Sequence, residues 1–292
     1  MAVSIRSFFF VVAFLFSGLQ GFGQQEPPFS NYESNLSIFN PALTGAEYKN
    51  FVTLVGRNQW IDFPHHPVTY SAVVESKWTA IRSGIGLNFL YDQLGFEESN
   101  HVYLNYAYHH PLRKNRSISG GIAFGVYHNH IEIDSLVSES SFFGTIEDPL
   151  LQQDPSGSVW MGNAGLLYRT YHVTVGFSLS QIALSRATGF INPVVHCFFF
   201  AKYEIPLSYE LKITPEFIYR TDQSSYLNEF GLSIKFRNFW MGGSLRNSST
   251  WVGKVGVDIQ KKFRIGYAYD YFTPDPSRFG PTHEVVLGFV VK

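Results

Sequence analysis

Alternation with a period of two residues recurs in segment after segment from Phe51 to the end of the chain. From Phe263 to Tyr271, apolar and aromatic residues occupy every second position. The positions between them hold small or charged residues, namely Arg264, Gly266, Ala268 and Asp270. Because successive side chains of a β-strand point to opposite faces, each segment predicts a strand with one apolar face. The other face carries glycine, small polar residues and charges.

These segments predict an all-β chain of about fourteen strands that closes into a transmembrane antiparallel β-barrel. A soluble sandwich also alternates. Aromatic residues at the strand ends favour the barrel, where they form girdles at the two membrane interfaces, and the glycine-rich polar face favours a wet lumen. The expected strands span 51–58, 69–77, 83–92, 98–109, 117–132, 159–169, 172–180, 194–204, 209–220, 226–236, 239–247, 250–260, 263–271 and 283–291.

The connections between these strands fall into two sets that alternate along the chain. One set is short, with connections at 78–82, 110–116, 170–171, 205–208, 237–238 and 261–262. The other set contains every long connection: 59–68, 133–158, 181–193 and 272–282. Outer-membrane barrels have short periplasmic turns and long outer loops. With an even strand number, both ends of the chain are then expected on the periplasmic side.

The N-terminus has the pattern of a secretory signal peptide. Arg6 supplies a positive charge, Ser7–Leu19 is apolar, and small residues precede Gln24. The apolar run is too short to span a membrane, which disfavours the alternative of a retained anchor. We therefore expect an exported outer-membrane protein with a signal peptide (1–23), an N-terminal periplasmic or lumenal segment (24–50) and a β-barrel (51–292).

Composition excludes several classes of function. A net charge of -1 leaves no electrostatic footprint for nucleic acid. The single Cys197 excludes a cysteine-based zinc site, and we expect it to be a small packing residue rather than a reactive thiol. His128 and His130 share a strand face, but no third ligand is placed by spacing, so no metal or cofactor is expected. No nucleophile elbow or Ser–His–acid spacing is present, so the sequence does not predict an enzyme.

Charge is distributed unevenly between the two sets of connections. No Lys or Arg occurs between Arg116 and Arg169, an interval that holds six acidic residues. Basic residues, among them Lys261 and Lys262, lie at short turns. These features are either ordinary solvated turns or an acidic outer loop and a basic inner rim for different partners. The partner-binding candidates are Lys261, Lys262, Phe142 and Phe143.

The mature N-terminal region carries motifs that resemble a known family. Gln25 and Phe29 precede the turn motif Asn40, Pro41, Ala42 and Gly45, and the loop motif Arg57, Asn58, Gln59 and Trp60 follows the first strand. In this order the motifs resemble the PorP/SprF family of the type IX secretion system. Asn40 and Pro41 favour a turn and Gly45 tolerates a positive φ. The alternative is that these motifs serve barrel closure alone.

The resemblance implies an outer-membrane barrel that helps a type IX system secrete or display particular cargo, such as the adhesins of gliding cells. The implied partners are the secretion machinery of the periplasm and outer membrane, a secreted surface cargo protein and the lipid bilayer. The alternative function is an outer-membrane channel for small or hydrophobic solutes. Barrel width does not separate the two, because fourteen strands lie between filled 8-stranded barrels and open 16–18-stranded porins.

Overall fold

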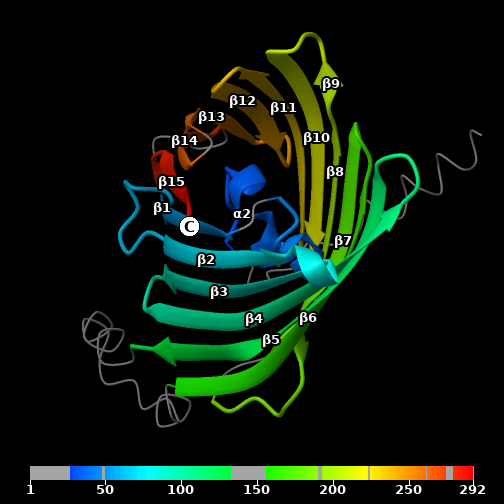
Figure 1. Ribbon diagram of the computed structural model, residues 1–292. Helices are drawn as coiled ribbons and strands as arrows, with labels where there is room; N and C mark the ends of the chain where they lie inside the picture. The colour runs from blue at the N-terminus through cyan, green and yellow to red at the C-terminus, as the bar shows by residue number, and fades with distance from the viewer. Residues whose placement is uncertain are drawn as a thin grey trace, which may run out of the picture.

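The computed structural model describes residues 27–47, 50–132, 156–189, 193–222, 224–260, 262–273 and 279–291. Its strands close into a barrel around a short helical segment (Figure 1). The strands are β1 (Asn50–Asn58), β2 (Val68–Trp78), β3 (Ser83–Leu94), β4 (Glu97–Leu112), β5 (Arg116–Ile131), β6 (Ser156–Arg169), β7 (Val173–Ala183), β8 (His196–Tyr203), β9 (Ile205–Pro206), β10 (Leu211–Thr221), β11 (Tyr226–Phe236), β12 (Phe239–Arg246), β13 (Thr250–Ile259), β14 (Phe263–Phe272) and β15 (Thr282–Val290).

Apart from β8 and β9, strands that are neighbours in sequence pair antiparallel, and the pairing of β1 with β15 closes the sheet. The two-residue strand β9 follows β8 after Glu204, and both pair with β10, so they occupy one position in the wall. The predicted antiparallel barrel of fourteen strands is therefore confirmed, with strand bounds within a few residues of those expected. A single closed sheet also excludes the sandwich.

The outward face of the barrel is apolar along its whole circumference. Leu104, Ile122 and Leu166 on successive strands are 60–63% exposed. Soluble monomers rarely expose contiguous apolar surface on this scale, whereas lipid requires it. Exposed aromatic residues form a belt towards each end. One belt contains Trp78, Tyr108, Tyr203, Phe236, Phe239 and Phe263, and the other contains Tyr70, Trp160, Tyr226, Trp251 and Tyr271.

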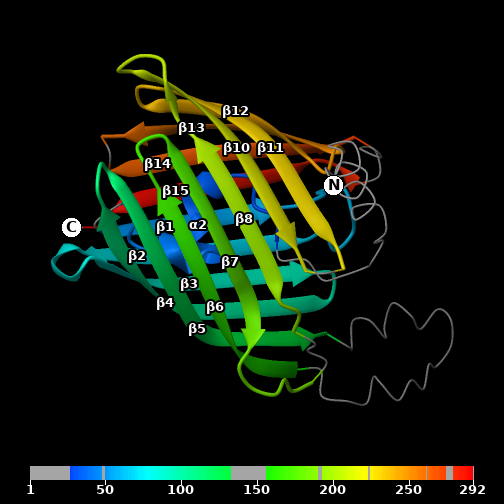
Figure 2. The same cartoon turned by 90° about the vertical axis from the view of Figure 1, so that its right-hand side faces the viewer.

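The two ends of the barrel differ in their connections, and Figure 2 shows them on opposite sides. The end here called the short-turn end carries the connections after β2, β4, β6, β9, β11 and β13. The opposite end, the long-loop end, carries the connections after β1, β5, β7 and β14 together with three brief turns. β1 begins and β15 ends at the short-turn end, where Phe51 pairs with Val290.

Three short helices complete the described structure. They are α2 (Tyr32–Phe39), the 3-10 turn η1 (Pro41–Leu43) and the 3-10 turn η2 (Thr79–Ile81). Across the residue ranges given above, no helix has the length and apolar character that crossing a membrane requires. Whereas η2 forms a turn at the short-turn end, α2 and η1 lie inside the barrel and pack against buried side chains of the wall to form its interior core.

Candidate functional site

Residues 27–47, here called the lumenal segment, fill the interior of the barrel (Figure 1). Phe29, Tyr32 and Phe39 are each at most 2% exposed and pack against Phe198 and Phe200 of β8. The ring centroids of Phe39 and Phe198 lie 5.1 Å apart. Because stacked and tilted aromatic pairs add to the stability gained by burial, this cluster fixes the segment in the lumen.

The lumenal segment runs from one end of the barrel to the other. At the long-loop end, the Pro27 carbonyl accepts a hydrogen bond of 3.3 Å from Arg220. At the short-turn end, the Gly45 N–H donates to Glu75 at 3.4 Å. The expectation that both chain ends lie on one side is therefore wrong for the described residues. The chain crosses the lumen before β1 begins, so Pro27 lies at the end opposite to β15's last residue.

The turn motif lies against the barrel wall. Asn40 caps η1 by accepting a hydrogen bond of 3.0 Å from the Ala42 N–H. Its side-chain amide donates to the carbonyls of Leu166 and Phe177 at 3.1 and 3.2 Å, which ties the turn to β6 and β7. Gly45 has a φ of +65°, a conformation that glycine adopts without strain. The motif is thus a docking turn, held by one capping and two cross-wall hydrogen bonds.

Glycines of the wall make this docking possible. A Cβ at Gly84, Gly121 or Gly165 would lie within 2.0–2.3 Å of the lumenal segment, against Thr44 O, Ala42 N and Asn40 Oδ1 respectively. These distances are far below van der Waals contact, so only glycine permits the approach. The expectation that the glycine-rich face lines a wet lumen is wrong at these positions. There the glycines accommodate a packed segment of the same chain.

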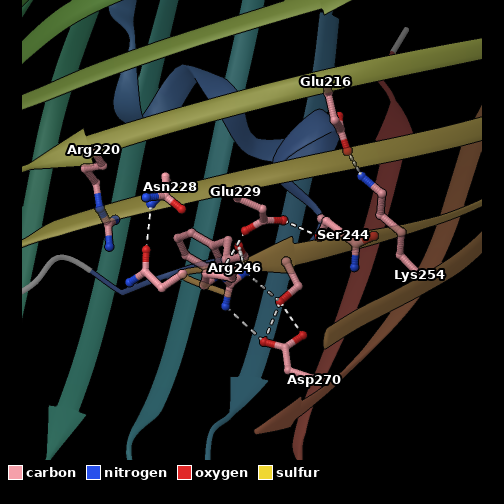
Figure 3. Close-up of polar contacts among 12 residues, drawn as sticks. Glu216, Arg220, Asn228, Glu229, Ser244, Arg246, Lys254 and Asp270 are labelled. Atoms are coloured by element: carbon pink, nitrogen blue, oxygen red, sulfur yellow. Dashed lines mark hydrogen bonds and ion pairs between the residues drawn. The ribbon is translucent and has the colours of Figure 1, made fainter. Parts of the chain in front are cut away.

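A buried network of charges holds the start of the segment. Arg57 of β1 pairs with Asp270 of β14 at 2.8 Å and with Glu284 of β15 at 3.2 Å. Arg246 of β12 pairs with the same Asp270 at 3.2 Å and with Glu229 at 2.8 Å. All five side chains are at most 7% exposed, and Figure 3 shows the Arg246 half of the network. Because buried charges are tolerated only when paired, these residues depend on one another.

The charge network binds the lumenal segment through backbone groups and through the Ser30 hydroxyl. The two carboxylate oxygens of Glu284 accept hydrogen bonds of 2.7 Å from the N–H groups of Ser30 and Asn31. The Ser30 hydroxyl donates to Asp270 at 2.7 Å, and Arg246 donates to the Phe29 carbonyl at 3.1 Å. Hydrogen bonds to charged groups are stronger than those between neutral groups. The network therefore clamps Phe29–Asn31.

A second polar group holds α2 deeper in the barrel. Lys254 of β13 contacts Glu216 and lies 3.7 Å from Glu33 of α2 (Figure 3 shows the contact with Glu216). The Ser233 hydroxyl donates to Glu33 at 3.0 Å. Burial alone would raise the pKa of Glu33, but Lys254, Lys202 and the Ser233 hydrogen bond outweigh burial and lower it. Glu33 is therefore a carboxylate that binds the cations around it.

The loop motif divides between the lumen and the long-loop end. Arg57 belongs to the charge network, whereas Asn58 is exposed at the end of β1. The Gln59 N–H donates to the Pro67 carbonyl at 2.9 Å and closes the connection to β2. Trp60 has a φ of +57°, and its backbone N–H donates to the Thr282 hydroxyl at 3.2 Å. Its ring packs on Phe279. The motif thus links the β1–β2 connection to β15.

Of the partner-binding candidates, only Lys262 falls in the described part of the chain. It is exposed in the turn between β13 and β14, and its carbonyl accepts a hydrogen bond of 2.8 Å from Val290. Lys261, Phe142 and Phe143 lie outside the described residues. A site shared by these four candidates therefore stays a prediction.

Charged residues separate between the two ends of the described barrel. The short-turn end carries Lys77, Arg82, Arg113, Lys114, Arg116, Arg169, Lys202, Lys212, Lys235, Arg237, Lys262 and Arg264. Acidic residues there are fewer: Glu47, Glu75, Glu204, Glu210 and Asp258. Apart from the inward arginines of the lumen, the long-loop end is acidic, with Asp62, Asp92, Glu97, Glu98, Glu132 and Asp222 against Arg186. Opposite fields at the two ends favour different partners.

The two larger of the cavities that adjoin the lumenal segment in the described structure lie one at each end. A cavity of about 610 Å³ at the long-loop end is lined by Pro27, Trp60, Leu94 and Phe272, with Arg57 and Asp270 at its base. A cavity of about 350 Å³ lies at the short-turn end. Among the described side chains, no three His, Cys, Asp or Glu residues group as a metal site. The arrangement thus supports binding, and the charge network holds the segment in place.

Sequence reasoning named Arg57 but missed Asp270, Glu284, Glu229 and Arg246. A signal for them is present, because all five occupy inward positions of the alternating pattern. Charged residues inside membrane-spanning segments are rare and almost always paired. Pairing between inward charges was therefore to be expected, but the sequence does not show which strands bring them together.

Residues 21–289 match the family described as type IX secretion system membrane protein PorP/SprF. Among solved structures, the Ralstonia pickettii toluene transporter TbuX is similar with a TM-score of 0.50 and 10% identity, over 89% of this chain and 94% of that chain. The CymD monoaromatic hydrocarbon channel gives a TM-score of 0.48 and 12% identity, over 92% and 94%. At 10% identity, the likeness to TbuX shows a shared fold alone. No curated protein matches the chain.

Proposed function

Because the chain belongs to the PorP/SprF family of type IX secretion system membrane proteins, we propose that it assists the secretion or surface display of particular cargo proteins. It is an outer-membrane β-barrel. The observation that carries the proposal is the family match over residues 21–289, which covers both the lumenal segment and the whole wall. Gliding adhesins are one class of cargo that such a protein would serve.

The filled lumen supports a role in assembly rather than in conduction. An aromatic cluster and a paired charge network hold the lumenal segment across the barrel. Opening a path for solutes would require breaking both, and uncompensated buried charges are costly. A scaffold that presents its two charged ends to different proteins needs no open path.

The proposal includes an orientation in the membrane. Outer-membrane barrels carry their long loops outside and their short turns in the periplasm. The short-turn end would then face the secretion machinery, and the long-loop end would face cargo at the cell surface. Residues 1–23 act in this proposal as the signal peptide, and residues 24–50 precede the barrel domain.

A second candidate function is an outer-membrane channel for small or hydrophobic solutes. The cavity of about 610 Å³ at the long-loop end favours it, because apolar side chains such as Leu94, Leu227 and Phe272 line much of its wall. Cavities of this size and character bind small molecules in other proteins. The lumenal segment lies below this cavity and has to move before a solute crosses.

A deletion strain and the purified barrel together test both functions. Surface proteomics is expected to show the loss of one or a few secreted proteins while other type IX substrates remain at the surface. The purified barrel in a planar bilayer is expected to show no solute-selective conductance. An unchanged surface proteome together with such conductance would overturn the cargo role and favour the channel. A general block of secretion would make the protein a core part of the machinery.

A further inference from the structure

The cavity at the short-turn end lies between the lumenal segment and one side of the barrel wall. The turn η1 packs on the glycines of the opposite side, next to β4, β5 and β6. This packing leaves a cavity of about 350 Å³, whose wall residues come from the end of β6 and from β7, β8, β10, β11, β12 and β14. Glu33 and Leu43 form its inner boundary, and Lys202, Trp240 and Arg264 line its wall. We call it the short-turn cavity.

Two hydrogen-bond donors of the short-turn cavity have no acceptor among the residues that the structure describes. Lys202 makes no hydrogen bond and no ion pair within 4 Å in the described part of the chain, although its charge helps to lower the pKa of Glu33. The buried Trp240 Nε1 has no hydrogen-bond partner among the described residues. A buried donor without a partner is destabilising. Both donors would be satisfied by an anionic acceptor.

The other cations of the cavity already have partners of their own. Arg264 pairs with Asp258 at 2.8 Å, and Lys235 pairs with the same carboxylate. Arg169 lies 4.0 Å from Glu47, at the limit of an ion pair. Among the described cations that line the cavity, Lys202 is therefore the one without a carboxylate within 4 Å. A ligand carboxylate is the group that supplies the missing charge.

The position of the cavity favours a peptide over a lipid as the source of that carboxylate. Lys202 and Trp240 occupy inward positions of β8 and β12, and the cavity is bounded by the lumenal segment. Lipid headgroups surround the outward face of a barrel, on the other side of its wall. A side chain of an extended protein segment reaches the cavity through the mouth of the barrel, where the surrounding basic residues attract acidic sequences.

We propose that the short-turn cavity is a binding site for an acidic segment of a partner protein. A glutamate or aspartate side chain of that segment enters the cavity and accepts hydrogen bonds from Lys202 and Trp240. This inference deepens the proposed function, and it rests on that function for placing the partner on the periplasmic side. The proposed site differs from a general electrostatic attraction to the basic end, because binding depends on hydrogen bonds from Lys202 and Trp240.

The test uses the full-length barrel in detergent micelles and a fluorescein-labelled hexaglutamate peptide, with hexaglutamine as the peptide control. Fluorescence anisotropy measures the affinity. Lys202→Gln is expected to weaken hexaglutamate binding about tenfold or more, because a hydrogen bond to a charged group is lost. Trp240→Phe keeps an aromatic ring but removes the donor, and it is expected to weaken binding about tenfold, because the carboxylate loses one charge-assisted hydrogen bond.

Lys77→Gln is the matched control, since Lys77 lies at the same end on the side packed by η1 and does not line the cavity. Lys77→Gln is expected to change the affinity for hexaglutamate less than about twofold. This small change should vanish in high salt, because salt screens the attraction between surface charges. Equal affinities of the Lys202→Gln variant and the wild type would overturn the proposal. So would an equal loss in Lys77→Gln, which would mean that the whole basic end attracts the peptide.

The failure of this inference is distinguishable from the failure of the proposed function. If hexaglutamate binds as expected but deletion leaves the surface proteome unchanged, the binding site is supported and the cargo role is contradicted. If deletion removes cargo but Lys202→Gln does not affect hexaglutamate binding, the cargo role stands and the site falls. Heat-modifiability of each variant on gels shows that it has folded.

Discussion

At the scale of single residues, close packing inside the barrel depends on glycine. Gly120 and Gly121 are neighbours on β5 but point to opposite faces. A Cβ at Gly121 would lie 2.3 Å from Ala42 N in the lumenal segment, whereas at Gly120 the nearest atom, on Leu166, is 4.0 Å away. Replacing each glycine by alanine therefore distinguishes the effect of a clash with the lumenal segment from the effect of alanine on the strand itself.

Gly121→Ala is expected to destabilise the folded barrel by about 1–3 kcal/mol, because the added methyl group displaces the docked turn. Gly120→Ala is expected to leave stability unchanged or slightly raised. Urea unfolding of the refolded protein, followed by tryptophan fluorescence, measures the difference. Equal midpoints for the two variants would contradict the close approach of η1 to β5.

Arg57 illustrates how a buried charge depends on its partners. Arg57→Met removes the cation that Asp270 and Glu284 share, and it is expected to cost about 3–5 kcal/mol, as in other buried ion pairs that lose one member. The control is Arg237→Met, because Arg237 pairs with Glu210 at 2.8 Å on the exposed surface. That variant is expected to unfold at the wild-type urea concentration. A small effect in both variants would mean that the lumenal network contributes little.

At the scale of elements, each strand separates a lipid-facing row from a lumen-facing row. In β11, Leu232 is 47% exposed on the outer face, whereas Ser233 bonds Glu33 inside. Leu207 is also apolar and exposed, but it lies in the turn between β9 and β10, beyond the spanning strands. The two leucines therefore differ in depth within the membrane rather than in exposure to the outside.

Leu232→Arg is expected to destabilise the barrel by about 2–4 kcal/mol, because an arginine near the middle of the bilayer faces hydrocarbon. Leu207→Arg is expected to have little effect, since its side chain reaches water. Folding into vesicles, followed by heat-modifiability on gels, compares the two. A larger defect in Leu207→Arg would place the membrane differently along the barrel.

At the scale of the whole molecule, the two ends of the barrel differ in loop length and in charge. Long connections and acidic residues share one end, and short turns and basic residues share the other. The lumenal segment joins the two ends through the interior. Such a molecule is suited to contact one class of partner on each side of the membrane.

The proposed orientation predicts which residues are accessible on intact cells. In a Cys197→Ser background, Arg186→Cys at the long-loop end is expected to react with an impermeant maleimide on whole cells. Lys262→Cys at the short-turn end is expected to react only after lysis. Both native side chains are exposed, so accessibility to the reagent decides the outcome. Reversed labelling would invert the barrel and move the short-turn cavity to the cell surface.

The strands, their number and their faces could be predicted from the amino-acid sequence alone. A period of two fixes which side chains share a face, and connection lengths follow from the spacing of the strands. The turn motif at Asn40–Gly45 and Arg57 were recognised by resemblance, without a role. Only the tertiary structure decided that the segment occupies the lumen and that Ser30 meets Asp270 and Glu284. Alternation distinguishes inward from outward side chains. Contacts between residues so distant in sequence form only when the barrel closes, because its register then determines which inward residues face one another.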